Sequence, residues 1–410
     1  MNRGFYTILA AQFFSALADN ALLFAAIALL ASLNAQAWQT PVLQQFFVFA
    51  YIVLAPFVGP FADSLPKGRV MFVSNAVKLL GCIAMLMGMH PLMAYGLVGV
   101  GAAMYSPAKY GILTEYLPHQ KLVLANGWME GLTVAAIILG SILGGIMVSH
   151  KFADYVFARA DFPLIETGID TPPELAITVI LLFYFIAALI NLYIPKVAID
   201  HKLQKRNPVF IMQDFWHSFR LLWRDPLGQV SLAVTTLFWG VGATLRLIVL
   251  TWASMALKFN MEKATQLTAV VAVGIALGSV LAAKYVSLKR AVHVLPVGIA
   301  MGLLVVTMVF VTDWRIAIVL LILIGAMGGY FVVPMNALLQ HRGHLLMGAG
   351  HSIAVQNFNE NLSILVLLGI YALMIKIDVP IKAVIITFGL FIAAAMAYLT
   401  RKHWHDQDRA

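Results

Sequence analysis

Ionisable side chains interrupt several long apolar stretches of this sequence. Asp19 lies near the centre of the run FFSALADNALLFAAIALLAS, residues 13–32, and Arg246 ends the segment LFWGVGATLR. A charged group at the middle of a membrane helix costs roughly 2.5–3.5 kcal/mol on insertion scales. A side chain that bears this cost must face protein or water, so these residues are candidates for a ligand site.

Asp19 shares one face of its predicted helix with Gln12 and Ser15, which lie seven and four residues earlier. The polar stripe has two interpretations. The carboxylate contacts a cation or carries a proton in a wet cavity, or it forms a structural pair with a basic neighbour. We favour the first interpretation.

Arg246 is permanently charged, and its planar guanidinium forms bidentate contacts with phosphate or carboxylate. It shares a helical face with Trp239 and Gly242. Its candidate partners are an anionic group of a substrate or the carboxylate of Asp19. We expect it to bind substrate.

Two further apolar stretches carry charged residues beside other polar groups. Tyr105 and Lys109 lie one helical turn apart in YSPAKYGILTE, although Lys109 is close enough to the helix end to extend its ammonium to water. Glu130 follows Asn126 by one turn in ANGWMEGLTVAA. We expect Tyr105, Lys109 and Glu130 to contact substrate.

The densest polar cluster is SIAVQNFNENLSIL, residues 352–365. Gln356, Asn359 and Glu360 share a helical face, and Asn336 lies in the preceding apolar stretch. A helix this polar cannot face hydrocarbon, because unsatisfied amides there cost several kcal/mol. The cluster either lines a substrate cavity or supplies hydrogen bonds between helices. We include these four residues among the candidate substrate contacts.

These residues give an interior of both charge signs. Arg246 and Lys109 stand against Asp19, Glu130 and Glu360, a set suited to a substrate with both an anionic and a cationic group. Asparagine, glutamine and aromatic residues would dominate a site for a neutral sugar.

The composition indicates a membrane protein. Of 410 residues, 61% are hydrophobic and 11% are charged, whereas soluble domains carry about 25% charged residues. A membrane-spanning helix needs about 20 mainly apolar residues. Stretches of that kind predict an all-α membrane protein with twelve spans: Phe5–Leu33, Val42–Ala62, Arg69–Met89, Pro91–Leu117, Leu122–Ser149, Ala176–Lys196, Leu227–Ala256, Thr265–Ser287, Val292–Thr312, Arg315–Leu339, Gly348–Met374 and Val379–Thr400.

The distribution of Lys and Arg predicts that both termini are cytoplasmic. Most of the 27 basic residues fall at one set of span ends, as the positive-inside rule requires. This asymmetry also accounts for the net charge of +9 without a nucleic-acid partner. The first apolar stretch is too long for a cleavable signal peptide, so we expect it to remain as the first helix.

The longest polar segment between spans divides the chain into two halves. We predict an N-terminal six-helix bundle over 1–196, a cytoplasmic linker over 197–226, a C-terminal six-helix bundle over 227–400 and a cytoplasmic tail over 401–410. Within the linker, Phe210–Trp223 reads as an amphipathic helix in the membrane interface. Two six-span halves with a substrate site between them are the layout of the major facilitator transporters.

The motifs of the common enzyme classes are missing from the sequence. It contains no Walker A motif, no Gly-x-Ser-x-Gly, no His-Glu-x-x-His and no paired Cys-x-x-Cys. The spacing of His403 and Asp408 matches an acyltransferase motif, but it falls in a short tail after the last span. We therefore predict a protein without catalytic residues, metal site or cofactor.

The segment GPFADSLPKGRV, residues 59–70, resembles the signature loop of the major facilitator superfamily. In that family the Asp caps the next helix and pairs with an Arg to latch the cytoplasmic side. The resemblance implies a gate made of Asp63, Lys67 and Arg69. The interval from Asp63 to Gly68 is two residues longer than the usual pattern.

Several segments together resemble the bacterial lysophospholipid transporters of that superfamily. They include SALADNALLFA, LVGVGAAMYSPAKYGILTE, LFWGVGATLR, GGYFVVPMNALLQ and GAGHSIAVQNFNEN, and the likeness extends over nearly the whole chain except 150–174. It implies a monomeric flippase of the cell inner membrane that moves lysophosphatidylethanolamine and lysophosphatidylglycerol from the outer to the inner leaflet. A separate cytoplasmic acyltransferase–acyl-carrier-protein synthetase would then re-acylate them.

Two alternatives of other classes remain open from the sequence. One is a proton-coupled exporter of amphipathic drugs on the same fold, in which the buried carboxylates bind protons. The other is a membrane-embedded acyltransferase. Transport under an imposed pH gradient tests the first, and product formation by the purified protein tests the second.

Overall fold

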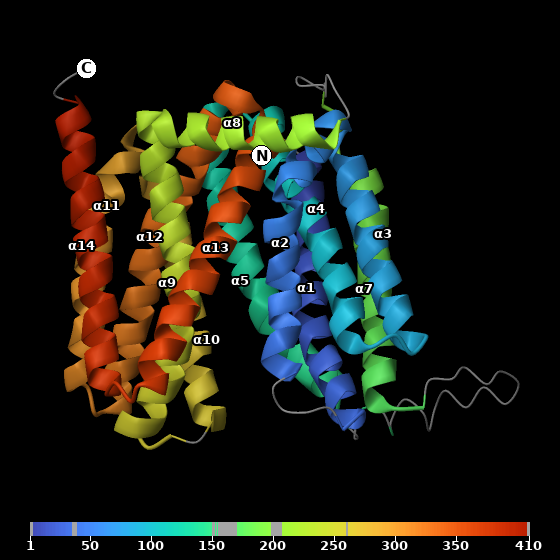
Figure 1. The fold of residues 1–410 in the computed structure, drawn as a ribbon, viewed down its shortest axis with the longest axis horizontal. Helices are drawn as coiled ribbons and strands as arrows, with labels where there is room; N and C mark the ends of the chain where they lie inside the picture. The colour runs from blue at the N-terminus through green and yellow to red at the C-terminus, as the bar shows by residue number, and fades with distance from the viewer. Residues whose placement is uncertain are drawn as a thin grey trace, which may run out of the picture. The chain divides into compact units, whose positions relative to one another are not determined.

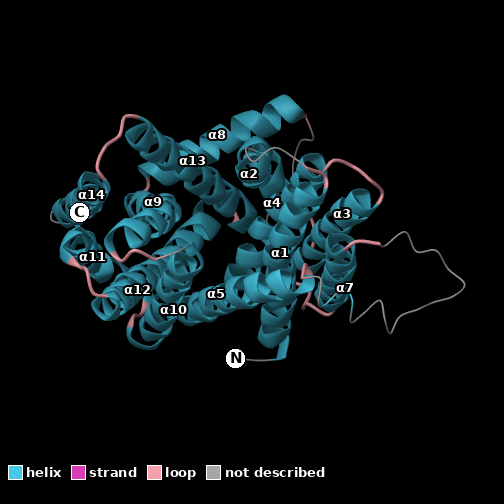
Figure 2. Cartoon of the chain, turned by 90° about the horizontal axis from the view of Figure 1, so that it is seen from below, coloured by secondary structure: helices cyan, strands magenta, loops and turns pink. Residues whose placement is uncertain are grey.

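The computed structural model describes residues 3–34, 39–149, 152, 154, 170–197, 207–259 and 261–407. These residues form α-helices and short 3₁₀ segments, and no β-strand occurs among them (Figures 1 and 2). The helices are α1 (Arg3–Ser32), α2 (Gln39–Ser64), α3 (Lys67–Leu86), α4 (Pro91–Tyr116), α5 (Leu122–Met147), α7 (Pro172–Leu192), α8 (Pro208–Arg224), α9 (Pro226–Ala256), α10 (Met261–Tyr285), α11 (Leu295–Thr307), α12 (Trp314–Met347), α13 (Ala349–Lys376) and α14 (Ile381–Gln407).

Eleven helices in the described part of the chain are long and apolar enough to cross a membrane. They match eleven of the predicted spans, so the all-α membrane fold class is confirmed. The remaining predicted span, Pro91–Leu117, is a helix of 26 residues, α4, which is not among the eleven. Its second half carries Tyr105, Ser106, Pro107 and Lys109, which make it less apolar than its neighbours. The count of twelve spans stays a prediction.

Several helix ends differ from the sequence-based boundaries, and two of them have a clear local cause. The predicted end of the tenth span at Leu339 is wrong, because α12 continues to Met347. Polar residues suggested a loop there, but two of them pair with neighbouring elements, as described below. The helix stops where Gly348 adopts φ 97°, a conformation that residues with a Cβ rarely tolerate. Most of the predicted outer loop 150–174 lies outside the described residues.

The helix α7 begins four residues before the predicted start at Ala176. Thr171 and Glu174 form a capping box at its first turn. The Glu174 carboxylate accepts hydrogen bonds from the backbone N–H of Thr171 at 2.9 Å and from its hydroxyl at 2.8 Å. This cap satisfies backbone donors that a helix start leaves free.

The chain divides into two compact units. Unit 1 contains Met1–Ile112 and Ala135–Met212, and unit 2 contains Leu113–Val134 and Gln213–Ala410. The first half of α5 therefore clusters with unit 2 and its second half with unit 1. The bundle boundaries predicted at 196 and 227 stay predictions.

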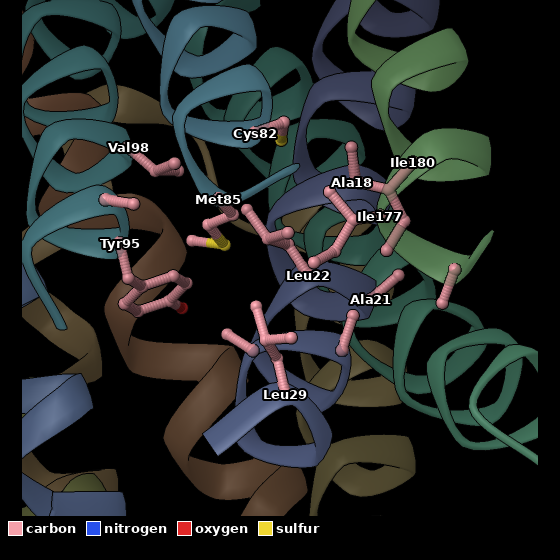
Figure 3. Packing of buried hydrophobic residues seen from close by; sticks show 14 of the residues in the cluster. Ala18, Ala21, Leu22, Leu29, Cys82, Met85, Tyr95, Val98, Ile177 and Ile180 are labelled. Carbon is pink, nitrogen blue, oxygen red and sulfur yellow. The ribbon is translucent and has the colours of Figure 1, made fainter. Parts of the chain in front are cut away.

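The core of unit 1 is formed mainly by α1, α3, α4 and α7, with Leu43 of α2 and Met147 of α5. Figure 3 shows Ala18 and Leu22 of α1 beside Met85 of α3 and Ile180 of α7, all within one buried hydrophobic cluster. Helix α7 packs along both α1 and α3. This packing fixes three helices around the polar side chains one turn away.

Unit 2 holds α8 from Gln213 onward and all later helices. Its largest helix contacts join α10 to α12, α11 to α14 and α9 to α13. The helix α8 occupies the position of the amphipathic helix expected over 210–223. Its buried residues Phe215, Ser218 and Leu222 recur at helical spacing. The rings of Phe215, Trp216 and Phe219 surround Phe358 of α13 at centroid distances of 5.6, 6.0 and 6.2 Å.

Candidate functional site

An ion pair between α1 and α3 lies inside unit 1. The ammonium of Lys78 is 2.8 Å from Oδ2 of Asp19. Lys78 also donates to the Ser15 hydroxyl at 3.0 Å, and Ser15 donates to Oδ1 of Asn75 at 2.8 Å. The Tyr184 hydroxyl of α7 donates to Oδ1 of Asp19 at 2.6 Å. Both carboxylate oxygens of Asp19 are therefore engaged by protein donors.

Lys78 is almost completely enclosed, with 1% of its side chain exposed. Its Nζ lies 4.8 Å from the ring centroid of Tyr105 and 5.5 Å from that of Tyr184. The faces of aromatic rings stabilise a desolvated cation. Its stem runs over Gly101 of α4, where an added methyl group would come within 2.7 Å of Cγ of Lys78. A buried charge of this kind persists only when it is paired and hydrogen-bonded.

Asp19 differs from Lys78 in its accessibility. Its side chain keeps 22% of its surface exposed. The carboxylate can therefore meet a second cation from its open side while Lys78 holds it from the closed side. A competing cation would leave the Lys78 ammonium to its remaining partners, Ser15 and two rings.

The partner of Asp19 was not among the residues we assigned to the substrate site. We named Arg246 as a candidate partner, and the ion pair described for Asp19 is instead with Lys78. The structural pair was the alternative left open for Asp19. The signal for Lys78 was present, because a lysine in the middle of an apolar helix needs an acid beside it.

Unit 2 contains a ladder of polar contacts between α5 and α12. Asn126 and Gln340 exchange amide hydrogen bonds at 2.9 and 2.8 Å. One turn further along, Asn336 donates to Oε1 of Glu130 at 3.4 Å. The pairing of Asn126 with Gln340 and of Glu130 with Asn336 shows that α5 and α12 run in opposite directions. All four side chains are buried.

The ladder continues into α13 through one amide. Gln356 donates to Oδ1 of Asn336 at 2.9 Å and to Oε1 of Glu360 at 2.7 Å. Glu130, Asn336, Gln356 and Glu360 thus form one connected network from three helices. Oε1 of Gln356 is buried and accepts no hydrogen bond from the described residues. It is an acceptor available to a donor such as an ammonium, a hydroxyl or water.

Asn359 does not join this network. Its amide donates to the carbonyl of Val355 on its own helix at 2.7 Å. The helix α13 therefore contributes Gln356 and Glu360 to the network, whereas the Asn359 amide bonds to a backbone carbonyl of α13 itself. Both interpretations of this polar helix, a ligand surface and a source of interhelical hydrogen bonds, describe part of what is observed.

Arg246 lies exposed on α9 and takes part in no ion pair among the described residues. Gly242, one turn earlier on the same face, has open space where a Cβ would stand. Lys109 on α4 is partly buried, and its Nζ lies 4.6 Å from the ring centroid of Tyr110. The guanidinium of Arg246 is therefore accessible to a ligand. The neighbouring position on the same helical face, Gly242, has no side chain that would block it.

The residues of the expected gate lie where α2 gives way to α3. Lys67 is 2.7 Å from Oδ1 of Asp63, and both side chains are buried. Lys67 also donates to the carbonyl of Ala62 at 2.8 Å. Pro66 occupies the N-cap position of α3, so Asp63 is not the N-cap residue that the family pattern implied. Arg69 is exposed.

A family model described as Major Facilitator Superfamily matches residues 8–367 of the chain. Proteins named lysophospholipid transporter LplT are similar to it. The one from Yersinia enterocolitica is 45% identical over 384 residues, which cover 93% of this chain and 90% of the relative. The one from Yersinia pestis strain Pestoides F is 45% identical over 385 residues, covering 94% and 90%.

Solved structures of transporters share the fold at low sequence identity. The outward conformation of the transporter FucP has a TM-score of 0.75 and 14% identity, covering 97% of this chain and 98% of its own. The human organic anion transporter MFSD10 has a TM-score of 0.74 and 14% identity, covering 98% and 100%.

Proposed function

Starting from the Major Facilitator Superfamily, to which this chain belongs, we propose that the protein carries lysophospholipids across a lipid bilayer. The observation that carries the proposal is the 45% identity, over 93% of the chain, to proteins named lysophospholipid transporters. The eleven apolar helices make it a multi-pass membrane protein. It is a transporter and not an enzyme.

The proposed substrates are lysophosphatidylethanolamine and lysophosphatidylglycerol. We propose that the protein moves them from the outer to the inner leaflet of a bacterial inner membrane by alternating access, and that it works as a monomer. A cytoplasmic acyltransferase–acyl-carrier-protein synthetase on a separate chain would re-acylate the product. The support for these details is the family resemblance together with the chemistry of the polar side chains.

The phosphate of the head group is assigned to Arg246 and Lys109. Arg246 is exposed, bears a permanent charge and has a fork of donors that matches two phosphate oxygens. Lys109 adds a second positive charge on α4, close to Tyr105 in sequence. An ion-paired arginine would have to release its partner before binding phosphate, whereas Arg246 has none among the described residues.

The ammonium of an ethanolamine head group is assigned to the carboxylates. Asp19 keeps an exposed side beside its contact with Lys78. Glu130 and Glu360 are joined by Asn336 and Gln356, and the free Oε1 of Gln356 adds an acceptor for an N–H donor. Tyr105 and Asn359 complete the candidate contacts. Asp63, Lys67 and Arg69 are proposed to act as a gate in which an ion pair holds one of two states.

A flipping assay in proteoliposomes tests the proposal. Fluorescent lysophosphatidylethanolamine or lysophosphatidylglycerol is added to the outer leaflet, and a membrane-impermeant quencher reports what remains there. We expect Arg246→Ala to slow transport of both substrates at least tenfold, because a charge-assisted bidentate contact is worth about 1.5–3 kcal/mol. Arg315→Ala, at an exposed arginine before α12's apolar stretch, is the matched control.

A second comparison separates the two head groups. Glu360→Gln should slow transport of the ethanolamine substrate more than that of the glycerol substrate, because only the former carries an ammonium. A monoacylglycerol, which lacks phosphate, should not be transported. Unchanged transport by correctly folded Arg246→Ala, or re-acylated product formed by the purified protein alone, would contradict the proposal.

A further inference from the structure

The ion pair between Lys78 and Asp19 is neutral as a whole, because opposite unit charges lie 2.8 Å apart. Among the described residues, Asp19 is the one acidic side chain within ion-pair distance of Lys78. The hydroxyl groups of Ser15 and Tyr184 add hydrogen bonds to the pair but no charge. A ligand that reaches Asp19 therefore meets a carboxylate whose charge the protein already balances.

The two members of the pair differ in their access to a ligand. The side chain of Asp19 is 22% exposed, whereas that of Lys78 is 1% exposed. The rings of Tyr105 and Tyr184 cover the ammonium at 4.8 and 5.5 Å, and α4 lies against the stem at Gly101. The cation is thus fixed behind the carboxylate, where a ligand cannot touch it.

Lys78 keeps its place when a ligand arrives, because a buried ammonium without its acid is strongly destabilising. Its other contacts are neutral, and the Ser15 hydroxyl among them already donates to Oδ1 of Asn75 at 2.8 Å. A carboxylate offers about four lone-pair sites, and Lys78 and Tyr184 occupy one on each oxygen of Asp19. The open side of Asp19 can therefore accept a hydrogen bond from a ligand while Lys78 remains bound.

The two proposed head groups differ in the group that they offer to Asp19. Ethanolamine offers an ammonium, and glycerol offers uncharged hydroxyl groups. An ammonium at the open side of Asp19 is attracted by the carboxylate and repelled by Lys78 behind it, so the two effects oppose each other. A hydroxyl responds weakly to both charges. The balanced pair therefore offers each head group a hydrogen bond and gives neither a large electrostatic advantage.

We propose that, in the transport proposed above, Lys78 is a positioning residue that sets head-group specificity: by balancing the charge of Asp19, it lets one carboxylate accept lysophospholipids with and without an ammonium group. Lys78 does not contact the ligand and acts through Asp19. Asp19 accepts a hydrogen bond from the ammonium of one head group or from a hydroxyl of the other.

The flipping assay described above, run with both substrates below saturation, tests this role. The measured quantity is the rate for lysophosphatidylethanolamine divided by the rate for lysophosphatidylglycerol. Lys78→Met leaves Asp19 with an unbalanced negative charge that attracts an ammonium. The ratio should rise about tenfold, because a unit charge a few ångströms away is worth at least that factor at an effective dielectric constant of about 20.

Two further variants complete a series of charges at this position. Asp19→Asn leaves the positive charge of Lys78 unbalanced, so the ratio should fall about tenfold for the same reason. The variant with both Lys78→Met and Asp19→Asn is neutral again, and its ratio should lie within about twofold of the parent value. A purely structural role of the pair would lower both rates together and leave the ratio unchanged.

Arg342→Met is the matched control, since it removes the cation of another ion pair, with Asp225, on other helices. It should leave the ratio unchanged even if both rates fall. Should Lys78→Met fail to fold, the ratios of Asp19→Asn and of the double variant decide the question.

The parent ratio in both single variants, or a shift in the same direction in both, would overturn the proposal. A shift in Arg342→Met as large as that in Lys78→Met would overturn it as well, because the effect would then not be local to Asp19. A parent protein that transports neither lysophospholipid would instead reject the proposed function, and the specificity role with it.

Discussion

The two units bury polar side chains in different ways. In unit 1 a carboxylate and an ammonium meet directly, with Lys78 2.8 Å from Asp19. In unit 2 two carboxylates, Glu130 and Glu360, are joined through amide side chains. An ion pair loses much when one partner is removed. An amide network can exchange one hydrogen-bonding group for another at lower cost.

This difference assigns separate tasks to the two networks. The pair in unit 1 holds α1, α3 and α7 together through Asp19, Lys78 and Tyr184. The network in unit 2 joins α5, α12 and α13 and leaves one acceptor of Gln356 unused. Unit 1 should therefore be more sensitive to a single charge change, and unit 2 more tolerant of one.

The largest effect is expected at the ion pair. Lys78→Met leaves the Asp19 carboxylate without its buried partner and should lower the free energy of unfolding by about 3–5 kcal/mol. Thermal unfolding in detergent measures it. Lys78→Met combined with Asp19→Asn should recover most of the loss, because no unpaired charge remains. If Lys78→Met were as stable as the parent protein, the two units would not differ in their sensitivity to a charge change.

The next effect concerns the reciprocal amide pair. Asn126→Leu leaves the buried amide of Gln340 without its partner, which should cost about 1–3 kcal/mol of unfolding free energy. The variant with both Asn126→Leu and Gln340→Leu should lose less than the sum of the two single changes. Chemical denaturation of all four proteins gives the coupling. Strict additivity would show that the pair contributes no joint stabilisation.

A smaller effect is expected for a charge change in unit 2. Glu360→Gln retains an oxygen that accepts from Gln356, and the introduced amide adds an N–H donor to a network that contains the unused Oε1 acceptor of Gln356. The unfolding free energy should change by about 1 kcal/mol or less. Asp19→Asn, measured in parallel, should cost more. Equal losses in the two variants would contradict the comparison.

The smallest effect is expected at the start of α9, at a residue just before the candidate membrane span. Asp225 caps this helix by accepting from the Gly228 N–H at 2.8 Å, and Arg342 of α12 binds both of its carboxylate oxygens. Burial opposes ionisation, but the hydrogen bonds from Arg342 and Gly228 outweigh it and lower the pKa of Asp225 below 3.8. The stability from this group is present above pH 3.8 and is lost as pH falls through the lowered pKa.

Asp225→Asn should therefore lower the thermal stability at pH 7 by only about 0.5 kcal/mol, since the pair is partly exposed. The difference from the parent protein should shrink below pH 3.8. Asp313→Asn is the matched control, because Asp313 caps α12 by accepting from the Arg315 N–H and forms no ion pair among the described residues. A difference that persists at low pH would show that Asp225 acts as a cap alone.

The apolar spans were predictable because hydrophobic length reports membrane crossing directly. The helix ends were less so. Gln340 and Arg342 lie in a polar segment that reads as a loop, yet they continue α12 because Asn126 and Asp225 satisfy them. The sequence contains both partners of each pair, but it does not indicate which helices pack against each other.

The sequence indicated which residues belong to the candidate site better than it indicated which of them contact each other. A carboxylate in an apolar stretch is energetically costly, so Asp19, Glu130 and Glu360 could be recognised as candidates from the sequence. The partner of Asp19 depends on how α1 and α3 pack, and Lys78 is 59 residues away along the chain. Tyr184 gave no signal, because a tyrosine in an apolar helix also packs without any polar contact.

The aromatic contact between α8 and α13 gives the molecule an optical reporter of its own. Trp216 lies 6.0 Å from Phe358, which stands between Gln356 and Glu360 on the same helix. A rotation of α13 that rearranged the polar network would also alter the environment of this partly exposed indole. In a variant that keeps Trp216 as its one tryptophan of the eight in the chain, the emission could follow a turnover in real time without any attached dye.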